Sequence, residues 1–198
     1  FKIANEDLEL RGAGNLLGKN QSGSISAVGF ETYIELLQQT IQELRGRGDE
    51  LEADFDPDVD LKVDAYIPED YIPSFEGRLR IYRSLSMAAS EGSLFDLVEG
   101  MQDEYGTPPE PVQELIGIME CRLMAKTLRI ARVLAHGRSL RLYFDETTPV
   151  SRRKLAALAG HNPERYRLYP EGRVGVMLEE DEAAELVGAV KKILRKLG

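Results

Sequence analysis

The stretch ARVLAHGRSLRLYF, residues 131–144, carries apolar residues at a spacing of two in short runs on either side of His136-Gly137-Arg138-Ser139. Apolar side chains at every second position are typical of a strand with one buried face, and a glycine between two such runs favours a tight turn. The stretch therefore predicts a β-hairpin.

Further strands and helices are predicted after the hairpin. Pro149 and Ser151 introduce a short helix through Ala159, and RYRLYP (165–170) and RVGVML (173–178) predict two strands around a turn at Glu171-Gly172. A last helix is predicted to bury an apolar stripe, formed by Leu186, Val190, Ile193 and Leu197. Acidic residues at its start and basic residues at its end complement the helix dipole.

Upstream of the hairpin, the pattern predicts one strand followed by three helices. Residues 61–67 alternate between apolar and polar side chains and predict a strand that ends at Pro68. Ser74 and Ser93 are the predicted N-caps of the first two helices. Thr107 with Pro108 opens the third helix. The expected buried faces are Phe75, Leu79, Tyr82 and Leu85 in the first helix; Leu94, Leu97, Val98 and Met101 in the second; and Val112, Leu115, Met119 and Leu123 in the third. The predicted fold class is α+β, a compact domain of several helices with short antiparallel strands.

An acidic stretch separates this domain from the beginning of the chain. Residues 49–60, DELEADFDPDVD, hold seven carboxylates and predict a solvated linker between a segment 1–48 and a domain 61–198. Segment 1–48 starts on what resembles the end of a helix stopped by Gly12, continues in a glycine-rich loop, and ends in an amphipathic helix over 29–45. Because the chain starts at Phe1, we expect it to be a piece of a longer protein.

Composition argues against several kinds of function. Cys121 is the single cysteine and lies among apolar residues, which predicts a buried thiol, and the two histidines are far apart. Phosphate-binding, nucleophile-elbow and zinc-protease motifs are absent from the sequence, so we expect no catalytic residue, cofactor or metal in this chain. A net charge of −9 disfavours a domain that wraps DNA by itself and suits a basic protein partner. Without a membrane-length apolar run, we expect a cytoplasmic protein.

The string DLELRGAGNLLGKNQSGSISAVGFETYIELL, residues 7–37, resembles the translocation motif shared by bacterial transcription-repair coupling factors and the RecG helicase. The resemblance implies that residues 1–11 are a hairpin helix and 12–24 a loop near double-stranded DNA, with Arg11 joining the two and Gln21 working in the loop. The residues implied in coupling motor to DNA are Arg11, Gly12, Gly14, Gly18, Gln21, Ser22 and Gly23. ATP and magnesium would bind in motor domains outside this chain.

Three later strings resemble the C-terminal domain of the coupling-factor family, which RecG lacks: VDAYIPEDYIP (63–73), RLRIYRSLS (78–86) and DEYGTPPEPVQELI (103–116). The resemblance implies a non-catalytic domain that packs on the N-terminal UvrA-binding module of the same protein. The resemblance also implies that this packing is autoinhibitory, and we call it the clamp. It would be released when the motor engages stalled RNA polymerase.

The candidate docking residues for such a clamp are Asp96, Glu99 and Asp103, which form an acidic stripe on the second predicted helix. A merely solvated helix face is the alternative. A nucleic-acid patch is a further hypothesis, formed by two basic clusters, Arg78, Arg80 and Arg83 with Arg152, Arg153 and Lys154. A stand-alone interaction module and an independent enzyme also remain open, and a deep pocket of ionisable groups would favour the enzyme.

Overall fold

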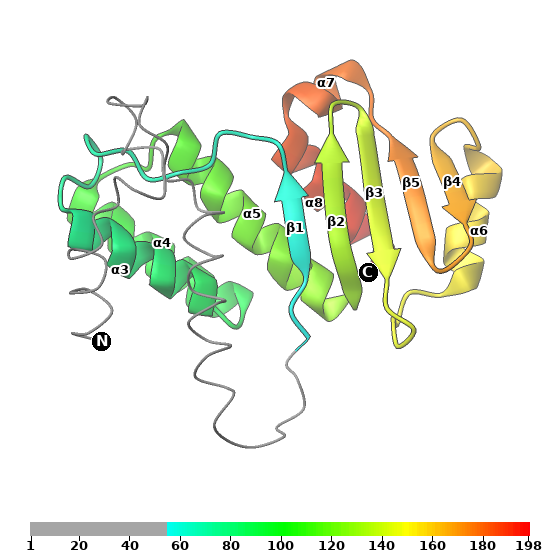
Figure 1. Cartoon of the computed structure of the whole chain (residues 1–198), viewed down its shortest axis with the longest axis horizontal. Coiled ribbons are helices and arrows are strands. Elements are labelled where there is room, and N and C mark those ends of the chain that lie inside the picture. Colours follow the sequence, from blue (N-terminus) through cyan, green and yellow to red (C-terminus); the bar gives the residue numbers. More distant parts are fainter. Residues whose placement is uncertain (1–54) are drawn as a thin grey trace, which may run out of the picture.

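A computed structural model describes residues 55–198 and shows six helices and one five-stranded sheet in that range, which confirms the α+β class (Figure 1). Residues 1–54, with the predicted motif and the first half of the acidic stretch, lie outside the described part. The elements are β1 (Asp58–Leu61), α3 (Phe75–Met87), α4 (Glu91–Tyr105), α5 (Glu110–Thr127), β2 (Ile130–His136), β3 (Ser139–Phe144), α6 (Arg152–His161), β4 (Tyr166–Tyr169), β5 (Arg173–Met177), α7 (Glu180–Ala184) and α8 (Leu186–Leu197).

The predicted hairpin is the centre of the sheet, whose strand order is β1-β2-β3-β5-β4. Strands β2 and β3 are antiparallel, and Gly137 in their two-residue connection has a φ of 55°, which suits glycine. The second predicted pair, β4 and β5, is also confirmed, with Glu171 and Gly172 both in the left-handed region at their turn. Because β1 runs parallel to β2, the sheet is mixed rather than purely antiparallel.

The first strand differs from the prediction. The alternating run at 61–67 was expected to form it, but β1 covers Asp58–Leu61, so the end of the acidic stretch lies in the sheet. Val59 and Leu61 continue the same alternation, and pairing with β2 selects this part of it. The Val63 amide then donates to the Leu61 carbonyl at 2.8 Å, a tight turn that ends the strand.

Helix α5 packs against β1 and β2 of the sheet and against the helices α3, α4 and α8 (Figure 1). Its predicted stripe is buried, as is the predicted stripe of α8, and the two helices lie against each other behind the sheet. Their contact is close at Gly117, where a Cβ atom would come within 2.4 Å of Val187 Cγ1. A larger residue at this position would push α8 away from α5.

Helices α3 and α4 lie on the other side of α5, and their caps decide where they begin. Ser74 caps α3 as predicted, with its Oγ accepting from the Gly77 amide at 3.2 Å. The predicted cap Ser93 is wrong, because Ser90 is the N-cap of α4 and Ser93 completes a reciprocal capping box as its third residue. Phe75 was also assigned to the core wrongly, since it is 61% exposed in the first turn of α3.

We predict that Gly117→Leu lowers the free energy of unfolding by about 1–3 kcal/mol, because the new side chain overpacks the α5–α8 contact. Gly100→Leu is the matched control, since Gly100 lies on α4 with nothing within 4 Å of a Cβ. There, loss of a helix-interior glycine should raise stability by up to about 1 kcal/mol. Urea unfolding of both variants checks this, and a Gly117→Leu protein as stable as wild type would contradict the packing described.

Candidate functional site

The acidic stripe lies on the outward face of α4. Asp96, Glu99 and Asp103 are all exposed, whereas Leu94 and Met101 on the opposite side are buried. Leu97 and Val98 are partly buried against the core, so the division of this helix into two faces follows the predicted pattern. Within residues 55–198, none of the three carboxylates forms an ion pair, which leaves their charge available to a partner.

The two flanks of the stripe differ in chemistry. On the flank toward α3, Glu104 accepts a hydrogen bond from Arg80 at 3.3 Å, and Arg80 also donates to the Tyr105 hydroxyl at 3.1 Å. On the other flank, Phe95 is 65% exposed. An exposed aromatic ring is a common anchor of a protein interface, whereas carboxylates such as these belong to the polar rim around it. The sequence analysis missed Phe95. Its position outside the apolar stripe of Leu94 and Met101 was the available signal that the ring is exposed.

The two predicted basic clusters are not brought together. One lies on α3 and the other on α6, at opposite ends of the molecule (Figure 1). Arg78 donates to the Ile72 carbonyl at 2.9 Å, and Lys154 donates to the Leu197 carbonyl at 3.0 Å, so both side chains hold the fold together. The hypothesis of one nucleic-acid patch from these six residues is therefore wrong.

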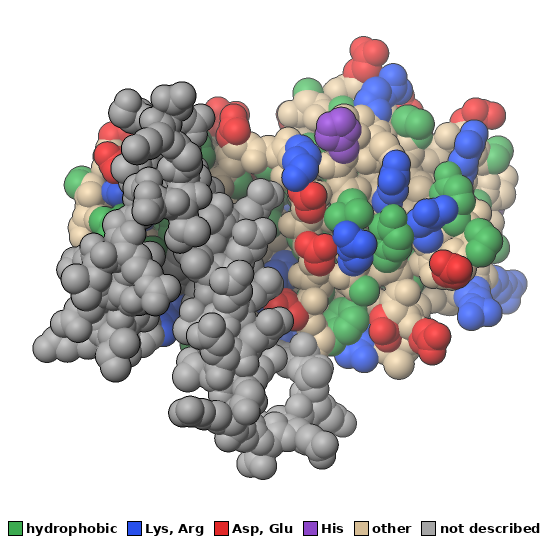
Figure 2. Space-filling view, viewed as in Figure 1, with side chains coloured by type: hydrophobic (Ala, Val, Ile, Leu, Met, Phe, Trp, Pro, Cys, Tyr) green, Lys and Arg blue, Asp and Glu red, His purple; other side chains and the backbone are tan. Residues whose placement is uncertain are grey.

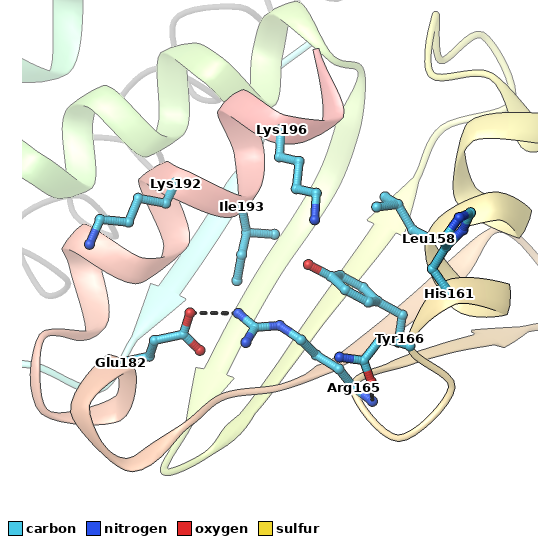
Figure 3. A pocket seen from close by; sticks show the side chains of 9 residues that line it. Leu158, His161, Arg165, Tyr166, Glu182, Lys192, Ile193 and Lys196 are labelled. Carbon is cyan, nitrogen blue, oxygen red and sulfur yellow. Dashed lines mark hydrogen bonds and ion pairs between the residues drawn. The ribbon is translucent and has the colours of Figure 1, made fainter.

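A cavity of about 310 Å³ lies between α6, the start of β4 and α8 (Figure 3). Its lining residues are Leu158, His161, Asn162, Arg165, Tyr166, Glu182, Lys192, Ile193 and Lys196. Arg165 extends toward Glu182 and donates to its Oε1 at 2.5 Å, and Lys196 Nζ lies 5.5 Å from the centre of the Tyr166 ring.

The chemistry of this cavity is that of a structural ion pair. The hydrogen bond from Arg165 lowers the pKa of Glu182, helped by a hydrogen bond from the Glu179 amide, and the same pair raises the pKa of Arg165. Both groups thus stay charged across the physiological range, whereas a general acid or base needs a pKa near the working pH. The cavity gives no support to the enzyme hypothesis.

Cys121 is fully buried, and its burial raises the pKa of the thiol to about 12, which agrees with the predicted packing role. Among residues 55–198 there is no cluster of three or more His, Cys, Asp or Glu that could hold a metal ion. No helix in this range has the length and apolar character to cross a membrane.

Comparisons with known proteins point to one family. Residues 61–155 match the family model described as the TRCF domain. Over its whole length the chain is 32% identical to the transcription-repair-coupling factors of Myxococcus xanthus and of Escherichia coli (strain K12), and 31% identical to that of Bacillus subtilis (strain 168). The chain spans only 16–17% of the length of these relatives.

The same answer comes from the fold. A crystal structure of the C-terminal domain of a transcription-repair coupling factor superposes with a TM-score of 0.61 at 17% identity, covering 75% of this chain and 95% of that one. The fold is thus that of a coupling-factor C-terminal domain. With the sequence matches, the chain belongs to the TRCF domain family.

The Arg165–Glu182 ion pair predicts that the stability of the domain depends on pH. Glu182→Gln keeps an acceptor for the Glu179 amide but removes the charge, so the variant should be less stable by about 1 kcal/mol at neutral pH. Because the folded-state pKa of Glu182 lies below its usual 4.5, the wild-type advantage is complete above that pH and is lost as the pH falls through the folded-state value.

Urea unfolding between neutral and acidic pH measures this difference. Glu180→Gln is the control, because the Glu180 side chain is 91% exposed and meets Arg138 only at 3.8 Å. A stability difference for Glu182→Gln that does not change with pH would contradict the assigned ion pair.

Proposed function

We propose that this chain is the C-terminal part of an ATP-dependent translocase of double-stranded DNA that removes stalled RNA polymerase and recruits excision repair. The chain itself would catalyse no reaction, and its domain would regulate by masking the UvrA-binding module near the N-terminus of the same protein. Similarity over the whole chain to transcription-repair-coupling factors supports this role.

The unpaired acidic face of α4 is the observation that carries the masking proposal. Three carboxylates on one exposed helix face favour a partner with basic side chains. Charge complementarity of this kind determines which partner binds and how the two surfaces align. Phe95 beside them would contribute an apolar anchor, since it has lost little of its accessible surface within the described domain. An interface with one ring and several charges can be released without exposing a large apolar area, as a regulatory clamp requires.

The arrangement predicts which changes open the clamp. In the full-length parent, Glu99→Lys with Asp103→Lys should place positive charge against a basic module and increase UvrA binding about ten-fold or more. Phe95→Ser should give a smaller increase through loss of the anchor. Calorimetry of UvrA binding at low and high salt measures both, and added salt should weaken masking in the wild-type protein.

Glu146→Lys with Glu164→Lys is the matched control. Both glutamates are exposed, lie away from α4, and give the same change in net charge. If this control opens the UvrA site as much as the α4 pair, net charge rather than the stripe controls masking. If neither pair changes UvrA binding, this face has a different role and the masking proposal fails.

Segment 1–48 is proposed to couple ATP-driven motion of the parent to DNA. In the full-length protein, Arg11→Ala or Gln21→Ala should leave ATP hydrolysis active but reduce translocation, because a sequence-independent motor needs directed contacts to the DNA backbone. Triplex displacement with parallel measurement of ATP turnover checks this. Unchanged displacement in both variants would contradict the assignment, and both positions lie outside the residues that the structure describes.

A further inference from the structure

The sheet has one face that no described element covers. Helices α5 and α8 pack on its inner side, where Val133, Leu142 and Val176 are buried. On the outer side, basic and hydrophobic side chains are interspersed over the strands, with acidic side chains and a histidine also present (Figure 2). We call this outer side the open sheet face and define it by Arg132, Arg141, Tyr143, Arg167, Tyr169 and Arg173.

The strand register aligns four of these residues in one row across the sheet. Arg132 pairs with Tyr143, Tyr143 with Arg173, and Arg173 with Tyr169, so cations and rings alternate. The Arg132 guanidinium lies 5.5 Å from the Tyr143 ring centre, and that of Arg173 lies 4.3 Å from the Tyr169 ring centre. Paired residues of neighbouring strands point to the same side of the sheet, so the two arginines and two tyrosines of this row all lie on its outer side.

A second row supplies charge. Arg141 and Arg167 are exposed, and both pair with Gly175, which lies between them on β5. Neither arginine has an ion-pair partner within the described range, in contrast to Arg132, whose Nε lies 3.2 Å from Asp58 at the edge of the sheet. The central and far strands therefore carry cations that remain available to an anion.

Gly175 lets an aromatic ring lie low on the sheet. A Cβ atom at this position would come within 3.1 Å of Tyr169 Cε2, so a larger residue would move the ring outward by a few tenths of an ångström. In addition, the Nε donor of Arg173 is shielded from solvent and has no hydrogen-bond partner among the described atoms. The exposed part of the surface thus holds rings and guanidinium groups close together, and the Arg173 Nε lies beneath it.

We propose that the open sheet face binds single-stranded DNA. Single-strand binders combine a cationic surface that follows the phosphates with rings on which bases stack, and arginine planes can stack as well. An acidic protein would explain the arginines but not the alternation with rings. A duplex hides its bases, so an unpaired strand fits this face better. His136, Ser139 and the tyrosine hydroxyls also lie on this side, and the choice of DNA over RNA rests on the proposed function, in which the parent protein acts on DNA.

This surface shares no residue with the acidic stripe of α4 and does not depend on the role proposed for Arg11 and Gln21. Its test uses the whole 198-residue chain and a fluorescent oligo(dT) strand of about 15 nucleotides, near the upper range of known site sizes. Fluorescence anisotropy should show binding that weakens with salt. Arg141→Glu with Arg167→Glu should reduce the affinity at least ten-fold and lower the salt dependence.

Arg152→Glu with Arg153→Glu is the matched control, because both side chains are exposed on α6 and the change in net charge is identical. The ring is tested separately: Tyr169→Phe should bind as wild type, whereas Tyr169→Leu, which still covers Gly175, should bind about five-fold more weakly. Circular dichroism and thermal unfolding verify that each variant is folded.

Several results would overturn the proposal. They are absence of oligo(dT) binding at low salt, equal weakening by the α6 control pair, and equal binding of Tyr169→Leu and wild type. A polyglutamate peptide that binds this face when oligo(dT) does not would assign it to an acidic protein instead. Tighter binding of oligo(U) than of oligo(dT), lost in the same variants, would overturn the choice of DNA.

Discussion

The packing of α5 between two layers is the constraint on which the described structure depends. One side of this helix carries the sheet and α8, with Gly117 allowing close contact to Val187, and the other side carries α3 and α4. Because α5 is buried on much of its circumference, its neighbours turn their apolar faces toward it, and their opposite faces are exposed to solvent. The acidic face of α4 and the outer face of the sheet are both consequences of this arrangement.

Patterns that depend on local spacing were predictable from the sequence. The hairpin, the β4–β5 pair and the buried stripes of α5 and α8 each repeat with one period over enough residues to be recognised. The limits of β1 were not predictable, since alternation runs from Val59 through Ile67 and only pairing with β2 selects part of it. Phe75 was misassigned because the buried face of α3 is formed by Ile81, Tyr82 and Leu85, which turns Phe75 toward solvent.

The two surfaces differ in how far sequence could reveal them. Asp96, Glu99 and Asp103 lie within one helix, so helical periodicity is sufficient to gather them on one face. The arginines and tyrosines of the open sheet face are spread from Arg132 to Arg173, and only the strand register brings them into rows. A single-residue slip in any strand would send its members to the buried side.

Net charge averages over surfaces whose charges differ in sign. A value of −9 disfavours DNA only if charge is spread evenly, and here carboxylates gather on α4 while guanidinium groups gather on the sheet. Because the core between these faces is densely packed, a ligand on one face changes affinity at the other only if it favours a different packing of α5. The two proposed binding surfaces share no residue, so a basic protein on the acidic face would not by itself cover the residues proposed to bind an unpaired strand.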